Sequence, residues 1–352
     1  MQSNFFDLDN RYAQLIKDPL VSINQVIDFS MFEPLLLQID NKARKSNAGR
    51  PVTNRTLMFK MLILQKLYNL SDEQTEFQSK DRLSFMRFLN LSLSGTVPDA
   101  NTLRMFREEL ILAQLIEPLF DLFNVAITCM GARLTSGQMV DATFVHAPKQ
   151  RNSRDENKII KEGRIPEDWS NNKAVQKDID ASWTKKNNKT YYGYKNHVNV
   201  DVKTKIITTY AVSTASVHDS MMLKELVEEA SSENEGFYAD SAYASAETAA
   251  LLHDNVLLNH TNERAYRNKP LTLMQEVMNR IRSTTRARVE HVFGFMVNSM
   301  GGKFIRTIGI KRAKAAIGLT NLAYNIKRTE FLVRSKQFDF SRINASDVWE
   351  MA

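Results

Sequence analysis

The sequence is poor in cysteine and has no long apolar run, and both shortages narrow the class of protein. Of its 352 residues only Cys129 is a cysteine, so the chain forms no internal disulfide and fits a reducing compartment. No apolar run approaches the roughly 18 residues that a membrane span requires, and the N-terminus lacks the basic and then apolar order of a signal peptide. These absences predict a cytoplasmic protein with no membrane partner.

Motifs for nucleotides and for zinc are missing as well. There is no P-loop and no Gly-rich dinucleotide fingerprint. The histidines have no spacing of the H-x-x-x-H kind, which argues against a zinc site at His146, His253, His260 or His291. The remaining candidates for catalytic or binding residues are therefore the carboxylates and the basic side chains around them.

Positive charge is concentrated in the last quarter of the chain. The net charge is +7, and residues 261–352 contain 17 Lys and Arg against 7 Asp and Glu. A basic region of this kind forms either a solvated surface or a face for the phosphates of a nucleic acid. The same region contains Glu290, a candidate catalytic residue, and this coincidence favours DNA.

The first 130 residues are predicted to form a helical domain. Residues 54–69 are apolar on more than one face, as in a buried helix. Helix N-caps are expected at Ser71, Asp81 and either Asp99 or Asn101. One interpretation is a DNA-binding domain of the helix-turn-helix kind, although many helical domains have the same composition; its short helices carry Arg82, Arg87, Arg104 and Arg107.

Residues 131–330 are predicted to form an α/β domain. Three segments are rich in β-branched and aromatic residues, and the last two should form a hairpin: 133–146, 191–200 and 203–213. Helix and strand then alternate through 219–230, 235–240, 245–254 and 256–261, before a long helix at 273–299 with a start signal at Thr272. This order predicts one mixed sheet flanked by helices.

Two segments fall outside that pattern. The polar stretch 147–190, between the first and second predicted strands, is expected to be a long insertion that is flexible over 149–172. Asp178 and Asp180 within it are expected to be solvated. Residues 331–352 are expected to be a C-terminal extension.

Three carboxylates are distinguished by their placement. Asp141 interrupts an apolar strand, where an unpaired charge is costly unless it is exposed or compensated. Asp240 ends a short strand just before a helix, at the crevice where open α/β sheets bind ligands. Glu290 lies on an Arg-rich helix. Such carboxylates can hold two divalent cations that act on a phosphodiester, so the trio predicts an enzyme that cuts and joins nucleic acid.

Basic side chains near the trio have two interpretations each. Arg286 lies one helical turn before Glu290 and either orients it or holds a phosphate, but with Arg288 it can equally form an ordinary surface ion-pair set. Lys195 and His197 share one side of a predicted strand, where they either touch substrate phosphates or belong to a plain sheet surface.

An ordered series of motifs carries a resemblance to a known family. VDATFV, DASWTKKNNKTYYGYKNHVNVD, VHDSMML, YADSAY and RARVEHVFG resemble, in this order, the catalytic domain of DDE transposases of bacterial insertion sequences, specifically the insertion-sequence-five family. The segment that begins GRPVTNRTLMFKMLILQKLYN is similar to the helical N-terminal domain of that family, and LAYNIKR near the C-terminus also matches. The resemblance covers nearly the whole chain.

The resemblance implies a ribonuclease-H-like core in which Asp141, Asp240 and Glu290 are the ligands of two Mg²⁺ or Mn²⁺ ions. It also implies cleavage at the ends of a mobile element and attack of the freed 3′-hydroxyl on target DNA. In the related signature a tyrosine and a lysine occupy the positions of Ser283 and Val297, so the DNA-end contacts assigned to them are in doubt. Lys303 is the predicted substitute for the lysine.

The predicted partner is double-stranded DNA, both as terminal inverted repeats and as target. Pairing of two ends predicts a homodimer or larger assembly, associated with the nucleoid in a bacterial cytoplasm. One alternative is a metal-dependent nuclease on the same fold without strand transfer; the helical N-terminal domain argues mildly against it. The other is a non-catalytic DNA-binding protein derived from a transposase; the intact trio argues against it.

Overall fold

The chain forms two compact units. A computed structural model describes residues 18–40, 53–130, 137–150, 152–186, 188–337 and 348–349. One unit comprises residues 1–132 with 322–352, and the other comprises residues 133–321. The second unit ends inside the last long helix, whereas the sequence placed the end of the catalytic domain at 330. The division into DNA-binding and catalytic domains stays a prediction.

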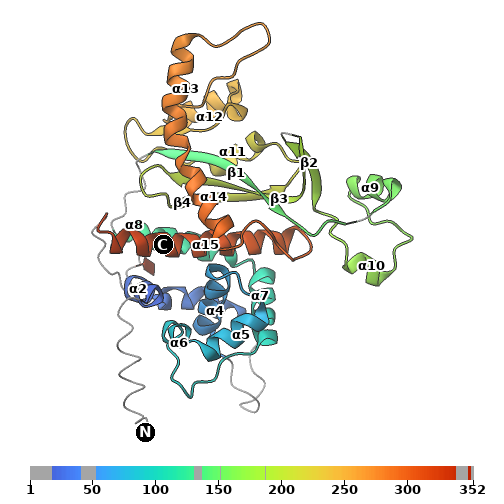
Figure 1. Cartoon of the computed structure of the whole chain (residues 1–352), viewed down its shortest axis with the longest axis vertical. Helices are drawn as coiled ribbons and strands as arrows, with labels where there is room; N and C mark the ends of the chain where they lie inside the picture. The colour runs from blue at the N-terminus through green and yellow to red at the C-terminus, as the bar shows by residue number, and fades with distance from the viewer. Residues whose placement is uncertain are drawn as a thin grey trace. The chain divides into compact units, whose positions relative to one another are not determined.

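The first unit is built from short helices around an aromatic core (Figure 1). The ring of Phe32 lies 6.0 Å from that of Phe29, 4.8 Å from that of Phe59 and 6.3 Å from that of Phe123, and all four side chains are buried. Its helices are α2 (Pro19–Val26), η1 (Phe29–Phe32), α3 (Glu33–Leu36), η2 (Leu37–Asp40), α4 (Arg55–Leu67), α5 (Asp72–Asp81), α6 (Leu83–Phe88), α7 (Ala100–Leu112) and α8 (Ile116–Cys129).

Two predicted helix starts in this unit are confirmed and one is wrong. The side chains of Ser71 and Asp99 accept the backbone N–H groups that open α5 and α7. Asp81 is instead the last residue of α5, because the N–H of Arg82 still bonds to Gln78 and closes that helix. Arg82, with φ −96° and ψ 115°, then begins α6 without a side-chain cap.

The second unit is built on a six-stranded mixed sheet, which confirms the α/β fold class with a ribonuclease-H-like sheet flanked by helices. The order is β2-β3-β1-β5-β6, and β4 shares with β2 the remaining edge of β3. The pairs β1–β3, β2–β3 and β3–β4 are antiparallel, while β1–β5 and β5–β6 are parallel. The strands are β1 (Gln138–His146), β2 (Ser182–Lys186), β3 (Lys189–Asp201), β4 (Ile207–Thr214), β5 (Gly236–Tyr238) and β6 (Leu258–Asn259).

Gly193 marks the point at which β3 passes from its pairing with β2 to its pairing with β4. Its φ is +139°, and a Cβ there would lie 2.4 Å from the carbonyl oxygen of Val145 and 2.6 Å from the nitrogen of Ala147. No side chain fits at those distances, so the close approach of β1 and β3 at this point requires glycine.

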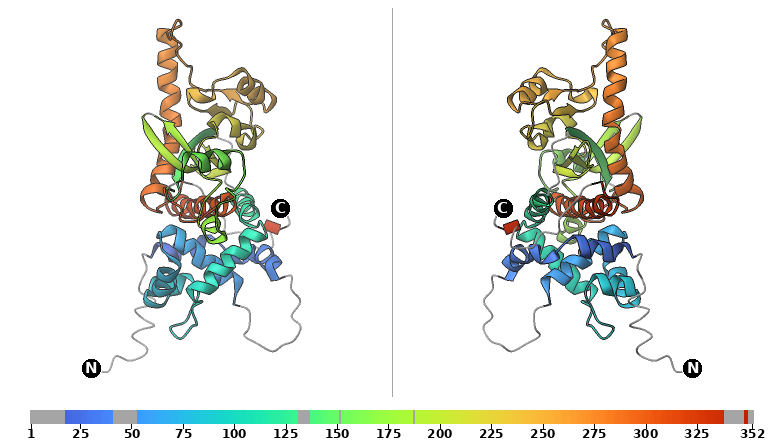
Figure 2. Two further views of the ribbon diagram at one scale, coloured as in Figure 1. Left: turned by 90° about the vertical axis from the view of Figure 1, so that its right-hand side faces the viewer. Right: turned by 90° about the vertical axis from the view of Figure 1, so that its left-hand side faces the viewer.

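Helices cover both faces of the sheet (Figure 2). On one face α11 (Leu223–Leu226) and α12 (Ala246–Asp254) pack in a core with Val140 and Phe237. Since successive strand residues point to opposite faces, Asp141 lies on the other face. That face is covered by α13 (Leu273–Arg286), α14 (Arg288–Asn298) and the first part of α15 (Ile310–Arg334).

The predicted helix at 273–299 is two helices. Its start is confirmed, because Thr272 and Gln275 form a reciprocal capping box. At Ala287, with φ −56° and ψ −16°, the N–H bonds to both Ser283 and Thr285, so the last turn of α13 tightens and α14 begins anew. The predicted helix at 219–230 is likewise shorter: it consists of η3 (Asp219–Met222) and α11, and the residue that caps η3 is His218.

The stretch 147–190 is not a structureless loop. It contains β2 and two helices, α9 (Arg154–Lys161) and α10 (Asn171–Val175), which lie off one end of the sheet in Figure 1. The expectation that Asp178 and Asp180 are solvated is wrong for Asp178, and Asp180 is only partly exposed. Asp178 is buried and accepts a hydrogen bond from the Tyr194 hydroxyl, and Asp180 accepts the N–H of Ile310 at the start of α15.

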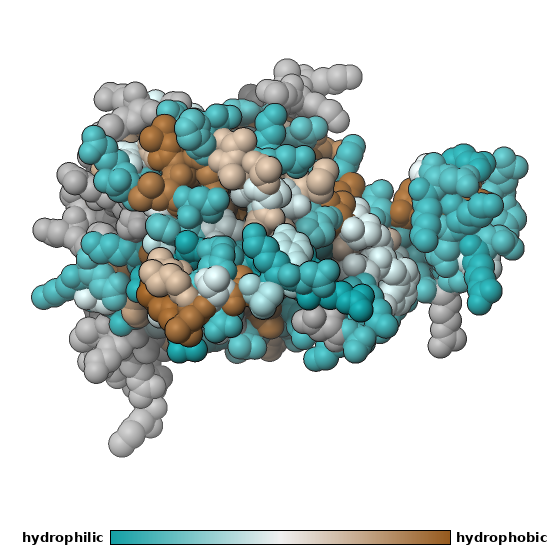
Figure 3. Space-filling view, turned by 90° about the horizontal axis from the view of Figure 1, so that it is seen from above, coloured by the Kyte–Doolittle hydropathy of each residue, from teal (hydrophilic) through white to brown (hydrophobic). Residues whose placement is uncertain are grey.

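Hydrophilic side chains dominate much of the face seen from above, with apolar ones in separate patches (Figure 3). Four apolar residues of α13 are exposed: Leu273, Met274, Val277 and Ile281. In the described ranges no single helix has both the length and the apolar character to cross a membrane. Two strongly bent helix pairs, Pro19–Val26 with Phe29–Ile39 and Ala100–Leu112 with Ile116–Cys129, meet that test by length and composition alone.

Candidate active site

Asp141 is held in the middle of β1 on the face that α13 and α14 cover. Its Oδ1 accepts the N–H of Ala142 at 2.8 Å, and its Oδ2 accepts a hydrogen bond from Nη1 of Arg286 at 3.0 Å. Burial raises the pKa of Asp141 to about 6. The Ala142 hydrogen bond and the charge of Arg286 oppose that rise, whereas the charge of Asp240 adds to it. Asp141 is thus a carboxylate that its surroundings leave short of compensating charge.

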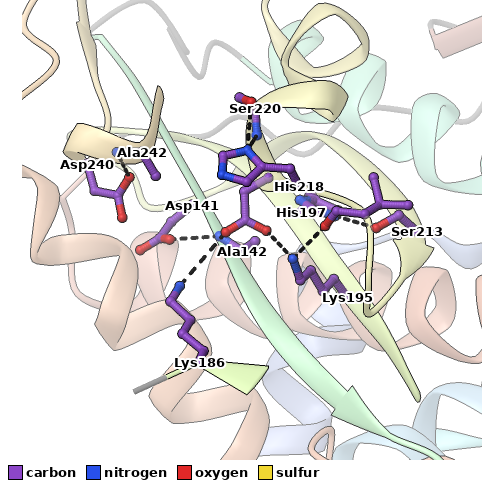
Figure 4. Close-up of polar contacts among 12 residues, drawn as sticks. Asp141, Ala142, Lys186, Lys195, His197, Ser213, His218, Ser220, Asp240 and Ala242 are labelled. Carbon is purple, nitrogen blue, oxygen red and sulfur yellow. Dashed lines mark hydrogen bonds and ion pairs between the residues drawn. The ribbon is translucent and has the colours of Figure 1, made fainter. Parts of the chain in front are cut away.

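Asp240 lies close to Asp141, two residues beyond the end of the neighbouring strand β5 (Figure 4). Met139 of β1 pairs in parallel with Tyr238 of β5, and each aspartate lies two residues further along its own chain segment. Since side chains alternate, both carboxylates face the same side of the sheet, as Figure 4 shows. Asp240 also accepts the N–H of Ala242 at 2.8 Å and so caps η4 (Ser241–Tyr243).

Glu290 joins the pair through Arg286. It lies in the first turn of α14, and its Oε1 is 3.5 Å from Nη2 of Arg286, the guanidinium that also bonds to Asp141. The Glu290 side chain is 63% exposed, so it faces solvent rather than the interior. The structure therefore brings the three predicted acids to one face of the sheet, with Arg286 between the first and the last.

The residues fit divalent cations by their chemistry. Carboxylate oxygens are the ligands that Mg²⁺ and Mn²⁺ prefer, and a cationic group, the Arg286 guanidinium, already lies between two of them. The Tyr243 hydroxyl is buried within the electrostatic reach of Asp141 and Asp240 and has no hydrogen-bond partner among the described residues. No group of three or more His, Cys, Asp or Glu side chains in the described ranges is drawn together closely enough to form a metal site.

A second polar cluster lies across the sheet. Lys195 donates to Asp219 at 2.7 Å and to the carbonyl of Val217 at 2.6 Å, and Lys186 lies 3.8 Å from the other Asp219 oxygen. Lys195 pairs with Phe144, so it points to the face opposite Asp141. Only Lys186, half exposed at the end of β2, also acts electrostatically on Asp141.

Sequence reasoning missed the parts played by Asp219, Lys186 and Tyr243. Asp219 lies in the motif VHDSMML, which is part of the resemblance. Tyr243 lies three residues after Asp240 in YADSAY, and burial raises its pKa well above the ordinary value, with the charges of Asp219, Asp141 and Asp240 adding to the effect. Its phenol therefore remains a hydrogen-bond donor.

The predicted DNA contacts have different outcomes. His197 is fully buried and bonds to Ser213 at 2.7 Å, and burial lowers its pKa to about 4, so it is a neutral interior residue. Lys195 is buried against Asp219. Both side chains are buried, and contact of either with DNA stays a prediction. Arg288 and Lys303 are exposed, and Arg288 donates to the carbonyl of Val202 at 3.3 Å.

The two departures from the family signature differ in surroundings. Ser283 accepts a hydrogen bond from Asn262 at 2.9 Å and so ties α13 to the segment after β6. Val297 is half-buried near the end of α14. A structural contact therefore occupies Ser283, whereas the role of Lys303 as a substitute stays a prediction.

Comparison with known proteins agrees with this arrangement. Residues 133–326 match the family described as "Transposase DDE domain", and residues 9–109 match the family described as "Transposase domain (DUF772)". The chain belongs to the DDE transposase family, and it is an enzyme of that class, a DNA transposase. Membership in the insertion-sequence-five family stays a prediction.

A solved structure is also similar to this chain. It is described as the cryo-EM structure of the piggyBac transposase synaptic complex with hairpin DNA. The two share 15% identity, with 97% of this chain and 80% of that chain covered and a TM-score of 0.45.

Proposed function

We propose that this transposase cuts DNA at the ends of a mobile element and joins the freed 3′-hydroxyl to target DNA. The observation that carries the proposal is the placement of Asp141 on β1 close to Asp240, which follows the neighbouring strand β5, with Glu290 linked to Asp141 through Arg286. The three carboxylates would hold two divalent cations, Mg²⁺ or Mn²⁺. Such ions activate an attacking oxygen and stabilise a leaving one.

Each residue has a defined part in this proposal. Asp141 and Asp240 are positioned by the backbone N–H groups of Ala142 and Ala242, so each keeps one carboxylate oxygen directed away from its own backbone contact. Glu290 lies on a helix and is open to solvent, so a DNA strand would be able to reach it. The Arg286 fork is shaped for a carboxylate or a phosphate.

DNA would be held mainly through its phosphates. The basic excess of residues 261–352 includes exposed Arg288 and Lys303, which are the proposed contacts near the site. The helical N-terminal unit would bind terminal inverted repeats, and two ends would be paired by a homodimer or larger assembly. A DNA substrate of this kind would place the enzyme at the nucleoid of a bacterial cytoplasm.

A strand-transfer assay tests the proposal. Short inverted repeats that flank the gene supply the end sequence, and the protein is incubated with Mg²⁺, labelled duplex ending in that repeat and plasmid target. We expect cleaved ends and labelled plasmid joined to them. Cleavage without joining would favour a nuclease, and binding without cleavage would favour a non-catalytic DNA-binding protein.

Isosteric variants test the site. Asp141→Asn, Asp240→Asn and Glu290→Gln should each abolish cleavage and joining while still binding the duplex. Asp178→Asn is a matched control, because Asp178 is buried in the same unit and bonds to Tyr194 away from the acids. If any of the three variants joined DNA at the wild-type rate, that residue would not belong to the site.

A further inference from the structure

Arg286 is bonded to the very oxygens that a metal ion would need. Its Nη1 lies 3.0 Å from Oδ2 of Asp141 and its Nη2 lies 3.5 Å from Oε1 of Glu290. The other oxygen of Asp141 is engaged by the N–H of Ala142. The Arg286 fork therefore covers the free oxygen of Asp141 and one oxygen of Glu290 at the same time.

A guanidinium and a divalent cation cannot occupy this place together. Both are attracted by the same two carboxylates, and at a few ångströms their mutual repulsion is strong in a partly buried site. Ion binding therefore requires Arg286 to leave Asp141. Binding of the ion must overcome the free energy of the Arg286 contacts, so these contacts lower the equilibrium affinity for the ion.

The surroundings of Arg286 favour such an exchange. Its Nε is buried without a hydrogen-bond partner in the described part of the chain, so the ion pair does not satisfy the whole guanidinium. Arg286 is also the last residue of α13, next to the helix break at Ala287, and Glu290 beyond the break is exposed. A guanidinium released toward solvent there presents the fork that binds a phosphate.

We propose that Arg286 exchanges partners, serving as the counter-ion of Asp141 and Glu290 in the absence of metal and moving to a DNA phosphate when metal binds. The inference rests on the proposed function, since it takes the acids as metal ligands and DNA as substrate. Arg286 would then do more than orient Glu290, because it would couple the two ligands. Metal binding would free Arg286 for a DNA phosphate, and DNA binding would draw Arg286 away from the metal ligands, so each ligand would favour the binding of the other.

Mn²⁺ binding without DNA tests the first half. Free Mn²⁺ is measured by electron paramagnetic resonance during titration of the full-length wild type, Arg286→Gln and Arg288→Gln. Arg288→Gln is the matched control, because it removes the same charge two residues away, from a side chain that donates to a backbone carbonyl. We expect Arg286→Gln to bind Mn²⁺ about three- to tenfold more tightly than wild type, as loss of a charge-assisted competitor predicts, and Arg288→Gln to stay within about twofold.

The sign of that change distinguishes the roles. If Arg286 only oriented a ligand, its loss would weaken Mn²⁺ binding, and equal or weaker binding by Arg286→Gln would overturn the exchange. Asp141→Asn separates this outcome from failure of the site itself. Wild-type Mn²⁺ binding that survives Asp141→Asn unchanged would refute both the exchange and the proposed metal site. Thermal melting in EDTA confirms that each variant is folded.

DNA binding tests the second half. Fluorescence anisotropy measures the affinity for a blunt linear duplex in EDTA and in Ca²⁺, an oxygen-ligated ion that substitutes for Mg²⁺ in binding. Wild type should gain more affinity from Ca²⁺ than Arg286→Gln does, by about three- to tenfold, because coupling between two ligands is reciprocal. Arg288→Gln should bind more weakly in both conditions yet keep the full gain. An equal gain in wild type and Arg286→Gln would overturn the transfer to phosphate.

Discussion

Two Arg–Asp ion pairs, one in each unit, have nearly the same exposure, but the pKa of the aspartate is shifted in opposite directions in the two. In Arg107–Asp72 of the helical unit the two side chains are 19% and 18% exposed, and in Arg286–Asp141 of the sheet unit they are 21% and 18% exposed. Burial works to raise the pKa of both aspartates. Yet the pKa of Asp72 lies below its ordinary value, while that of Asp141 is raised to about 6.

The number of hydrogen bonds explains the difference. Asp72 accepts two from Arg107, at 2.7 and 2.8 Å, and a third from Gln65 at 2.6 Å, and it opens helix α5, where a negative charge is favoured. Asp141 accepts only two, one from Arg286 and one from the N–H of Ala142, and has a second carboxylate, Asp240, nearby. The first pair is a saturated structural contact, whereas the second leaves the charge of Asp141 incompletely compensated, as is common at functional sites.

The largest expected effect separates the two pairs by activity. Asp141→Asn should lower DNA-end cleavage by at least about 1000-fold, or about 4 kcal/mol in the barrier, because a metal ligand is lost. Asp72→Asn should leave the rate per folded molecule within about threefold. Single-turnover cleavage, scaled to the folded fraction from circular dichroism, measures both. Comparable losses of cleavage rate in the two variants would contradict the distinction between a metal ligand and a structural aspartate.

Replacement of Asp72 should affect the stability of the protein, although it should hardly affect activity. Asp72→Asn should lower the free energy of unfolding by about 2–3 kcal/mol, since a hydrogen-bonded charge is removed from beside Arg107 and Lys66. The folded pKa of Asp72 is lowered, so this contribution is present above the unfolded pKa of about 3.9 and is lost as the pH falls through the folded pKa. Urea denaturation at pH 7 and at about pH 3 checks the prediction; a cost that persisted undiminished in acid would contradict it.

For Asp141 the pH dependence of the contribution to stability has the opposite sign. Its folded pKa of about 6 exceeds the unfolded value, so its contribution to stability is full below about pH 3.9 and is lost as the pH rises through about 6. Asp141→Asn, which resembles the protonated carboxyl, should therefore stabilise the metal-free protein by on the order of 1–3 kcal/mol at pH 8 and by almost nothing at pH 4. Melting curves in EDTA at the two pH values measure the difference, and destabilisation at pH 8 would show that Arg286 compensates Asp141 fully.

The smallest effect concerns Lys186, whose charge acts on Asp141 from a half-exposed position. Lys186→Met should raise the titration midpoint of Asp141 further, by at most about half a unit, because solvent screens an exposed charge. Carboxyl carbon NMR of labelled aspartate in EDTA follows that midpoint. Lys189→Met, at the start of β3, serves as control and should leave it unchanged, and an equally unchanged midpoint for Lys186→Met would mean that its charge does not reach the site.

Local signals in the sequence predicted much of the frame. Strand β1 was placed correctly around Asp141, and the short strand β5 was placed correctly just before Asp240, although it ends at Tyr238. The caps at Ser71, Asp99 and Thr272 are confirmed, because each depends on residues within one turn of the chain. The β3–β4 hairpin was predicted for the same reason.

What the sequence missed depends on contacts between distant segments. Asp141 and Arg286 are 145 positions apart, and no local pattern indicates their bond. No Gly or Pro next to Ala287 indicates the break between α13 and α14. Asp178 has the polar neighbours of a surface residue, yet the Tyr194 hydroxyl satisfies it in the interior. His197 fits a strand surface by its spacing, and only the packing of the sheet shows it to be buried.

Gly193 has a consequence for genetics. The position carries no functional group, but a methyl group there would collide with backbone atoms of Val145 and Ala147, and backbone cannot rotate away as a side chain can. A random screen for loss of mobility should therefore recover nearly every substitution at Gly193 alongside those at the acids. The two classes would be told apart by protein yield, since acid variants accumulate and glycine variants are degraded. Alleles of the second kind should also be temperature-sensitive, which would make them useful for switching the element off in living cells.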